Sequence, residues 1–199
     1  MLEGLESGAE GLLAALERRP VVPAVRSLGP ELEAALEGDH AAVFVLGGDA
    51  FELAERLRGR DPRPPVCVNV DLVSGVSSDA GGLRYLSRHV EGVISTHRRT
   101  IDLARQSGLV TIQRLFAIDS GAVERGLKMI VRAEPAFVEI LPALAYPEIA
   151  DYYRAVCGIP VLVGGLVTDP GGVSSLLGAG AAGVSTSDSG LWNHDSRER

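Results

Sequence analysis

Eight short runs of mostly apolar, often β-branched residues recur along the chain, and helix-like segments separate them. The runs cover residues 21–25, 42–46, 66–73, 92–96, 110–116, 137–141, 160–165 and 183–187. Most are apolar at successive positions, as is typical of strands buried on both faces of a parallel sheet. The helix-like segments cover residues 28–37, 51–60, 80–90, 100–106, 120–133, 147–156 and 170–177. The pattern predicts an α/β fold.

Strands that alternate with helices at this spacing indicate right-handed crossovers and a parallel sheet. Eight such units favour closure into a small (β/α)8 barrel of the TIM type, with eight parallel strands, over an open doubly wound sheet. The length of 199 residues is near the low end for a complete barrel, so we expect a single domain over residues 1–199. The polar end of the sequence, 193–199, is predicted to fray.

Composition narrows the class of protein. Hydrophobic residues make up 46% of the chain and charged residues 23%, the balance of an ordinary globular protein. No apolar run approaches the roughly 20 residues that span a bilayer, and the N-terminal residues do not resemble a secretory signal. Cys67 and Cys157 are isolated, as is typical of buried thiols in a reducing compartment. We therefore expect a cytoplasmic protein with no membrane partner.

The clearest chemical signal lies where the last two predicted strands end. Gly164 and Gly165 end the seventh strand, and Ser185, Thr186 and Ser187 end the eighth. Glycines let the backbone approach a ligand, and the start of the short segment 189–192 offers N–H groups to an anion. Because the loops after strands seven and eight often bind phosphate in such barrels, we predict a phosphate site. The alternative is a tight turn followed by helix-capping hydroxyls.

Other strand ends carry polar residues that would line the same end of the barrel. They are Arg26, Asn69, Asp71, Gln113, Arg114 and Glu139. Asn69 and Asp71 share a strand face, whereas alternation does not decide whether Gln113 or Arg114 points inward. Glu139 lies within an apolar strand, where an unpaired carboxylate is costly. These residues recognise ligand hydroxyls, or they form an internal ion-pair network such as Glu139 with Arg114.

Few residues suggest catalysis. Asp71 and Glu139 would serve as an acid–base pair, or with Asp119 as ligands of a divalent cation. The sequence lacks HxH, HExxH, GxSxG and Walker motifs, and no predicted strand carries the lysine of Schiff-base aldolases. His97 is the only histidine placed for catalysis, and a lone histidine there is more often a ligand contact. We predict no catalytic residue, metal or cofactor; the alternative is a barrel enzyme acting on a small phosphorylated polyol or sugar.

Seven motifs, in a fixed order, resemble one known family. They are PVVPAVRS (20–27), VNVDLVSGV (68–76), GVISTHRRTI (92–101), TIQRLFAIDS (111–120), VEILPALAYP (138–147), LVGGLVTD (162–169) and AGVSTSDSGLW (182–192). Together they resemble the glycerol-uptake-operon antiterminator regulatory protein family. The resemblance implies a (β/α) barrel that binds glycerol 3-phosphate and then promotes transcription past a terminator in a leader mRNA. It implies a metabolite sensor without catalytic turnover.

The resemblance also implies roles for individual residues. The phosphate would lie on Gly164, Gly165, Ser185, Thr186 and Ser187. The glycerol hydroxyls would meet some of Arg26, Asp71, Arg114 and Glu139. Asn69 stands where the family commonly has a histidine, and His97 stands where a basic residue, often arginine, usually follows I-S-T. With Gln113, these two residues are candidate ligand contacts that bear on which ligand binds.

The charge distribution bears on the RNA partner. The net charge of −7 is unlike that of most proteins that grip nucleic-acid phosphates. Residues 56–114, however, hold ten arginines and five acids, which leaves this segment at +5 and the remainder at −12. Four of these arginines are candidate RNA contacts: Arg84, Arg88, Arg98 and Arg99. The alternative is a solvated basic surface, and Tyr85 is the only aromatic residue of the segment, so base stacking is not evident. Nothing in the sequence indicates an oligomeric state.

Overall fold

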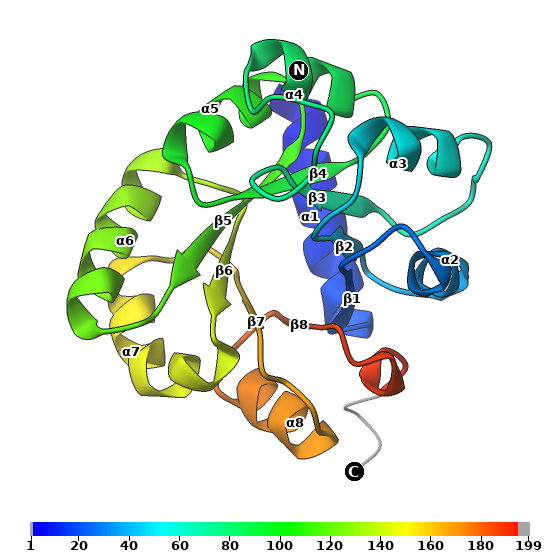
Figure 1. Ribbon diagram of the computed structural model, residues 1–199. Coiled ribbons are helices and arrows are strands. Elements are labelled where there is room, and N and C mark those ends of the chain that lie inside the picture. Colours follow the sequence, from blue (N-terminus) through cyan, green and yellow to red (C-terminus); the bar gives the residue numbers. More distant parts are fainter. Residues whose placement is uncertain (1, 195–199) are drawn as a thin grey trace.

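The protein folds into a closed barrel of eight parallel strands that follow one another in chain order (Figure 1). The computed structural model describes residues 2–194, with side chains from residue 8 onward. The strands are β1 (Val21–Val25), β2 (Val43–Val45), β3 (Val66–Asn69), β4 (Gly92–Ser95), β5 (Val110–Phe116), β6 (Phe137–Leu141), β7 (Val161–Gly164) and β8 (Gly183–Thr186). β8 pairs with β1, which closes the barrel. The predicted (β/α)8 TIM-type fold is confirmed.

Helices surround the barrel and return the chain from the end of one strand to the start of the next. They are α1 (Leu2–Arg18), α2 (Pro30–Glu37), α3 (Ala50–Leu57), α4 (Ala80–Leu86), α5 (Arg98–Gln106), α6 (Ser120–Ala133), α7 (Tyr146–Val156) and α8 (Pro170–Gly178), with the 3-10 turns η1 (Ala143–Ala145) and η2 (Ser189–Leu191). Four aspartates cap helix N-termini by accepting backbone N–H groups: Asp49 on α3, Asp79 on α4, Asp119 on α6 and Asp169 on α8. These caps fix the points where the loops after the strands enter the helices.

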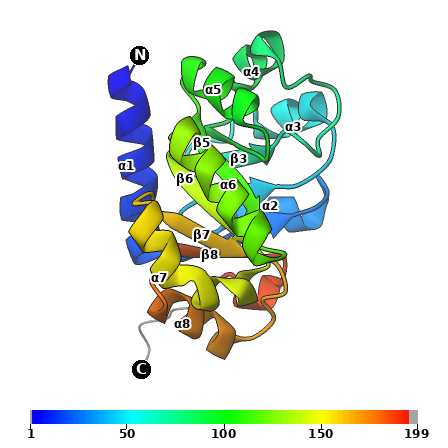
Figure 2. The same ribbon diagram turned by 90° about the vertical axis from the view of Figure 1, so that its left-hand side faces the viewer.

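Helix α1 precedes the barrel and was not among the predicted helices. It lies across one end of the barrel, apart from the ring formed by the other helices (Figure 2). Leu12 and Leu16 are buried in the same cluster as the inward-facing Phe44 and Ile112. A side chain at Gly183, the first residue of β8, would come within 2.7 Å of Leu16. α1 thus closes the N-terminal end of the barrel and leaves the C-terminal end for a ligand.

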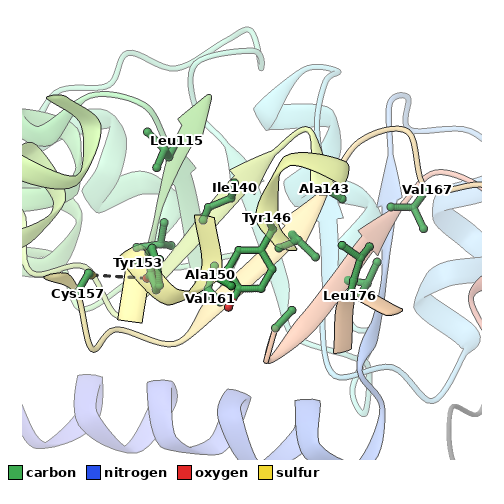
Figure 3. Packing of buried hydrophobic residues seen from close by; sticks show 14 of the residues in the cluster. Leu115, Ile140, Ala143, Tyr146, Ala150, Tyr153, Cys157, Val161, Val167 and Leu176 are labelled. Atoms are coloured by element: carbon green, nitrogen blue, oxygen red, sulfur yellow. Dashed lines mark hydrogen bonds between the residues drawn. The ribbon is translucent and has the colours of Figure 1, made fainter. Parts of the chain in front are cut away.

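Alternation along the strands divides the core into an inner and an outer layer. Ile112 on β5 and Cys67 on β3 face the barrel interior. Leu115 and Ile140 belong to the outer layer, where they pack with residues of α7 such as Tyr146 (Figure 3). Burial raises the pKa of the Cys67 thiol, so this inner cysteine stays protonated.

The described part of the chain ends shortly after η2. Asn193 and His194 follow the buried Trp192, and residues 195–199 of the predicted frayed tail lie outside the described residues. Within residues 2–194, no helix combines the length and the apolar character needed to cross a bilayer.

Candidate functional site

A cavity of about 520 Å³ opens at the C-terminal ends of the strands. Its walls come from strand ends and from the loops that follow β7 and β8. Its lining includes Arg26, Leu46, Leu72, Arg114, Glu139, Leu141, Gly165, Leu166, Val167, Thr168, Ser185, Thr186, Ser187 and Asp188. The C-terminal end is where (β/α) barrels place their binding sites. The structure therefore brings together most of the residues that the sequence singled out.

A buried ion pair forms the floor of the cavity. The Nε atom of Arg114 donates to Oε2 of Glu139 at 2.8 Å, and Nη2 forms an ion pair with the same oxygen at 2.7 Å. The Ser185 hydroxyl donates to the other carboxylate oxygen, Oε1, at 2.8 Å. The side chains of Arg114 and Glu139 are only 7% and 1% exposed. The ion-pair network that the sequence left open is thus present, and its members also line the cavity.

The loop after β7 has an unusual backbone. Gly165 and Leu166 adopt left-handed conformations in succession, with φ of 79° and 62°. Leu166 is not a glycine, so this conformation costs about 1–2 kcal/mol. Backbone strain of this kind clusters at binding sites. The N–H groups of both residues have no hydrogen-bond partner within residues 2–194, so they can donate to a bound anion.

Gly164 has a different role from its neighbour Gly165. A Cβ atom on Gly164 would lie 2.1 Å from Oγ of Ser185 and 3.2 Å from Oε1 of Glu139. The missing side chain therefore makes room for the hydrogen bond between Ser185 and Glu139. Gly164 is not among the residues that line the cavity, whereas Gly165 is.

The loop after β8 is tied to the loop after β7. The Thr186 hydroxyl donates to the carbonyl oxygen of Val167 at 2.9 Å and accepts the N–H of Asp188 at 3.1 Å. Asp188 in turn caps η2 by accepting the N–H of Gly190 at 3.0 Å. A carboxylate thus occupies the start of the short segment where the sequence suggested free N–H groups for an anion. Ser187 keeps an N–H group without a partner in the described chain.

The cavity contains one arginine whose charge is not neutralised. Arg26, at the end of β1, is exposed and forms no ion pair with any described residue. Arg114 is already paired with Glu139. Because an arginine can donate two parallel hydrogen bonds to a phosphate or carboxylate, Arg26 is the group best placed to attract an anionic ligand.

Asp71, predicted to contact ligand hydroxyls, is not among the residues that line the cavity. Its carboxylate accepts the Ser95 hydroxyl at 2.7 Å, and the N–H and hydroxyl of Thr96 at 2.7 and 2.9 Å. Asn69 accepts the N–H of Asp71 at 3.0 Å and also does not line the cavity. These residues connect the loop after β3 with the end of β4. These hydrogen bonds fix the loop after β3 at the side of the cavity. Leu72, the residue after Asp71, lines the cavity.

Gln113 and His97 also lie away from the cavity. Arg114 faces inward, so strand alternation directs Gln113 to the outer layer, where its Oε1 has no hydrogen-bond partner among the described residues. His97 occupies the N-cap position of α5 and lines a separate hollow with Asp79 and Arg99. Asp119, considered as a cation ligand, caps α6. Within residues 2–194 no group of three or more His, Cys, Asp or Glu residues could hold a metal ion.

Sequence reasoning missed several lining residues, including Leu46, Leu72, Leu166, Thr168 and Asp188. Each lies just after a strand end, and this position was the available signal. The apolar character of the three leucines and the acidic character of Asp188 did not suggest ligand binding. The four candidate RNA contacts lie on the outer helices. Arg84 and Arg88 are exposed on α4 and the turn that follows it, and Arg98 and Arg99 are exposed in the first turn of α5.

Comparisons with known proteins place this geometry in a family. Residues 21–192 match the family described as "Glycerol-3-phosphate responsive antiterminator". The glycerol uptake operon antiterminator regulatory protein of Listeria monocytogenes strain 4b F2365 is 29% identical, with a TM-score of 0.79 over 88% of this chain and 96% of that chain. An antiterminator-related protein of the glycerol uptake operon from Thermotoga maritima MSB8 is 27% identical, with a TM-score of 0.77 over 89% and 99%.

A relative in Escherichia coli strain K12, the uncharacterized protein YgcP, is 27% identical over 184 residues, which are 91% of this chain and 95% of that protein. The family match covers nearly the whole barrel, from β1 to the residue after η2. The chain therefore belongs to the glycerol-3-phosphate responsive antiterminator family.

Proposed function

We propose that this protein is a cytoplasmic sensor of glycerol 3-phosphate, with residues 1–199 acting as one domain. With the ligand bound, it binds the leader mRNA of glycerol-metabolism genes and allows transcription to pass a terminator. The observation that carries the proposal is the cavity at the strand ends, where the unpaired Arg26 lies near the free N–H groups of the loop after β7. In a member of this family, glycerol 3-phosphate is the ligand that fits such a site.

The two ends of the ligand would meet different parts of the cavity. The phosphate would accept the N–H groups of Gly165, Leu166 and Ser187 and would pair with Arg26. The glycerol hydroxyls would lie against the network of Arg114, Glu139 and Ser185. This network contains charged donors and acceptors whose positions are already fixed by hydrogen bonds, so little order is lost when the ligand binds.

The state of Glu139 supports binding over turnover. Both of its carboxylate oxygens accept hydrogen bonds from protein groups, so it is poorly placed to take a proton from a ligand. The described residues that line the cavity include no histidine, cysteine or lysine. The family is likewise a regulatory one.

Isothermal titration with glycerol 3-phosphate, glycerol and inorganic phosphate tests the ligand. We expect glycerol 3-phosphate to bind more tightly than either fragment, because only the whole ligand engages both ends of the cavity. Arg26→Gln should cost about 1.5–3 kcal/mol of binding free energy, the range for a hydrogen bond to a charged group. Arg132→Gln, on the exposed face of α6, should bind as wild type does. Absence of glycerol 3-phosphate binding, or its chemical conversion by the protein, would overturn the proposal.

A further inference from the structure

Three rings form a row on the outside of the barrel, between α3 and α4. The ring centroids of Phe51 and Tyr85 are 4.9 Å apart, and those of Tyr85 and His89 are 4.8 Å apart. Phe51 is 52% exposed, and Tyr85 and His89 are partly exposed. Phe51, Tyr85 and His89 are called the aromatic row below. The fold thus places two further rings beside Tyr85, which the sequence showed as a lone aromatic residue.

Hydrogen bonds fix the backbone at both ends of the aromatic row. At one end, Asp49 accepts the N–H of Phe51 at 2.9 Å, and a side chain at Gly75 would come within 3.0 Å of the Phe51 ring. At the other end, Arg63 donates to the carbonyl oxygen of His89 at 3.1 Å and pairs with Glu91 at 2.9 Å. A fixed backbone limits the entropy that is lost when a flat partner stacks on the row.

Two arginines without a charged partner precede rings of the row in the sequence, and Arg88 lines one hollow together with His89. Arg84 and Arg88 are each one residue before a ring of the row, and both are exposed. Within residues 2–194 neither side chain forms an ion pair or a hydrogen bond. The arginines of α3 and of the loop that follows it are engaged: Arg56 by Glu33 and Glu52, Arg58 by Glu55, Arg60 by Glu33 and Arg63 by Glu91.

A hollow of about 410 Å³ continues from the His89 end of the row. Its lining contains four arginines, Arg58, Arg60, Arg63 and Arg88, against two carboxylates, Asp61 and Glu91. Three of these arginines are paired with carboxylates, Arg58 with Glu55, Arg60 with Glu33 and Arg63 with Glu91, which leaves Arg88 as the unpaired cation at this end of the row. An anionic partner that passes along the row would meet this hollow next.

We propose that the aromatic row, with Arg84 and Arg88, binds unpaired bases and the adjoining phosphates of single-stranded RNA. The inference rests on the proposed function and adds to it the binding surface and the structural form of the RNA. Aromatic side chains stack on exposed bases, and guanidinium groups beside them pair with the phosphate backbone. A base-paired duplex hides its base faces, so the surface selects single strands. Charge complementarity favours RNA over an apolar peptide at this surface.

Fluorescence anisotropy with a labelled leader transcript, in saturating glycerol 3-phosphate, tests the surface. The double variant Phe51→Leu, Tyr85→Leu keeps apolar bulk but removes two stacking rings. It should bind the transcript at least tenfold more weakly than wild type. Tyr85→Phe keeps the ring and should stay within about twofold of wild type. Arg84→Glu with Arg88→Glu should weaken binding and reduce the slope of log affinity against log salt by about 1.4, or about 0.7 for each single-strand phosphate contact.

Matched controls lie on other faces of the barrel. Arg125 and Arg132 are exposed on α6, and Tyr152 is 47% exposed on α7. Arg125→Glu with Arg132→Glu, and Tyr152→Leu, should bind the transcript as wild type does. A fully base-paired RNA of equal length should bind at least tenfold more weakly than the single strand. Circular dichroism and glycerol 3-phosphate titration establish that each variant is folded.

The outcomes separate this inference from the proposed function. If wild type binds the transcript and the Phe51 and Tyr85 variant binds equally well, the surface is wrong and the antiterminator proposal stands. The surface would also be wrong if the Arg84→Glu, Arg88→Glu variant and the control Arg125→Glu, Arg132→Glu variant lost RNA affinity equally. If wild type fails to bind the transcript at low salt with ligand present, both proposals fail. Photo-crosslinking of a 4-thiouridine transcript to unmodified protein should label the peptide with Phe51 or Tyr85; labels confined to other peptides would overturn the inference.

Discussion

The Ser185 hydroxyl on β8 donates a 2.8 Å hydrogen bond to Glu139 on β6, a residue 46 positions earlier in the chain. The same carboxylate binds Arg114 on β5, so one buried acid joins three strands. Strands β6 and β8 are not neighbours, because β7 lies between them. The hydrogen bond spans that gap over Gly164, which has no side chain to block it.

Replacing Glu139 should strongly destabilise the protein. Glu139→Gln removes the negative charge and leaves the guanidinium of Arg114 buried without a counter-ion. Breaking a buried ion pair in this way costs about 3–5 kcal/mol of unfolding free energy. Urea denaturation of wild type and variant measures the loss. Glu124→Gln breaks the exposed pair with Lys128 and should leave the unfolding midpoint unchanged, which makes it the matched control.

Gly164 and Ser185 should be energetically coupled. Gly164→Ala places a Cβ atom 2.1 Å from the Ser185 Oγ, so the serine must move and its hydrogen bond to Glu139 is lost. Ser185→Ala removes that oxygen and makes room for the new methyl group. The loss of unfolding free energy in the double variant should therefore be smaller than the sum of the two single losses, by about 0.5–3 kcal/mol. Additive losses in a double-mutant cycle of unfolding free energies would disprove this role of Gly164.

Gly165 should matter for its backbone conformation. Its φ of 79° is unfavourable for residues with a side chain, although an added Cβ would meet only ordinary contacts at 3.5 Å or more. Gly165→Ala should cost about 1–2 kcal/mol of stability. It should also weaken glycerol 3-phosphate binding, because the N–H groups of the loop turn away from the phosphate. Gly178→Ala, at an open position of α8, serves as the control in both assays and should not weaken binding.

His40 should make stability depend on pH. Burial lowers the pKa of its imidazole, with Asp39 opposing this shift and Arg19 adding to it. Because the pKa is lower in the folded state, the unfolded chain binds the proton more readily between that pKa and about 6.5. Stability contributed by His40 is therefore lost as the pH falls below about 6.5. The ring packs edge-on to Trp192 at 6.4 Å, so His40→Phe should keep the packing and flatten the decline between pH 7 and pH 5. Urea denaturation at several pH values measures this decline. An equal fall in unfolding free energy for wild type and His40→Phe would contradict the prediction.

The sequence was sufficient to predict the barrel because the strands are buried on both faces and appear as apolar runs. It did not identify α1, although the leucines at positions 12, 13 and 16 have helical spacing. This stretch lies before the first β/α unit and was assessed only as a targeting signal. Leu16 packs in one cluster with inward-facing strand residues, so α1 covers the N-terminal end of the barrel.

The sequence predicted only some of the residues that line the cavity. The position of a polar residue along a strand does not show which neighbouring groups its side chain binds. Arg114 and Glu139 were identified from their place on apolar strands, and register decided that Arg114 faces inward. Asp71 has the same sequence features as a ligand contact, yet Ser95 and Thr96 occupy its carboxylate. The aromatic row could not be found by scanning, since Phe51 and Tyr85 are 34 positions apart in the chain.

Single-round transcription through the leader terminator, with purified RNA polymerase, tests the central claim most directly. Read-through should rise when the protein and glycerol 3-phosphate are both present, and should stay at the basal level with the protein alone or with glycerol. Arg26→Gln should require more ligand for the same read-through. The account is contradicted if the protein leaves read-through unchanged at glycerol 3-phosphate concentrations that saturate the cavity by calorimetry.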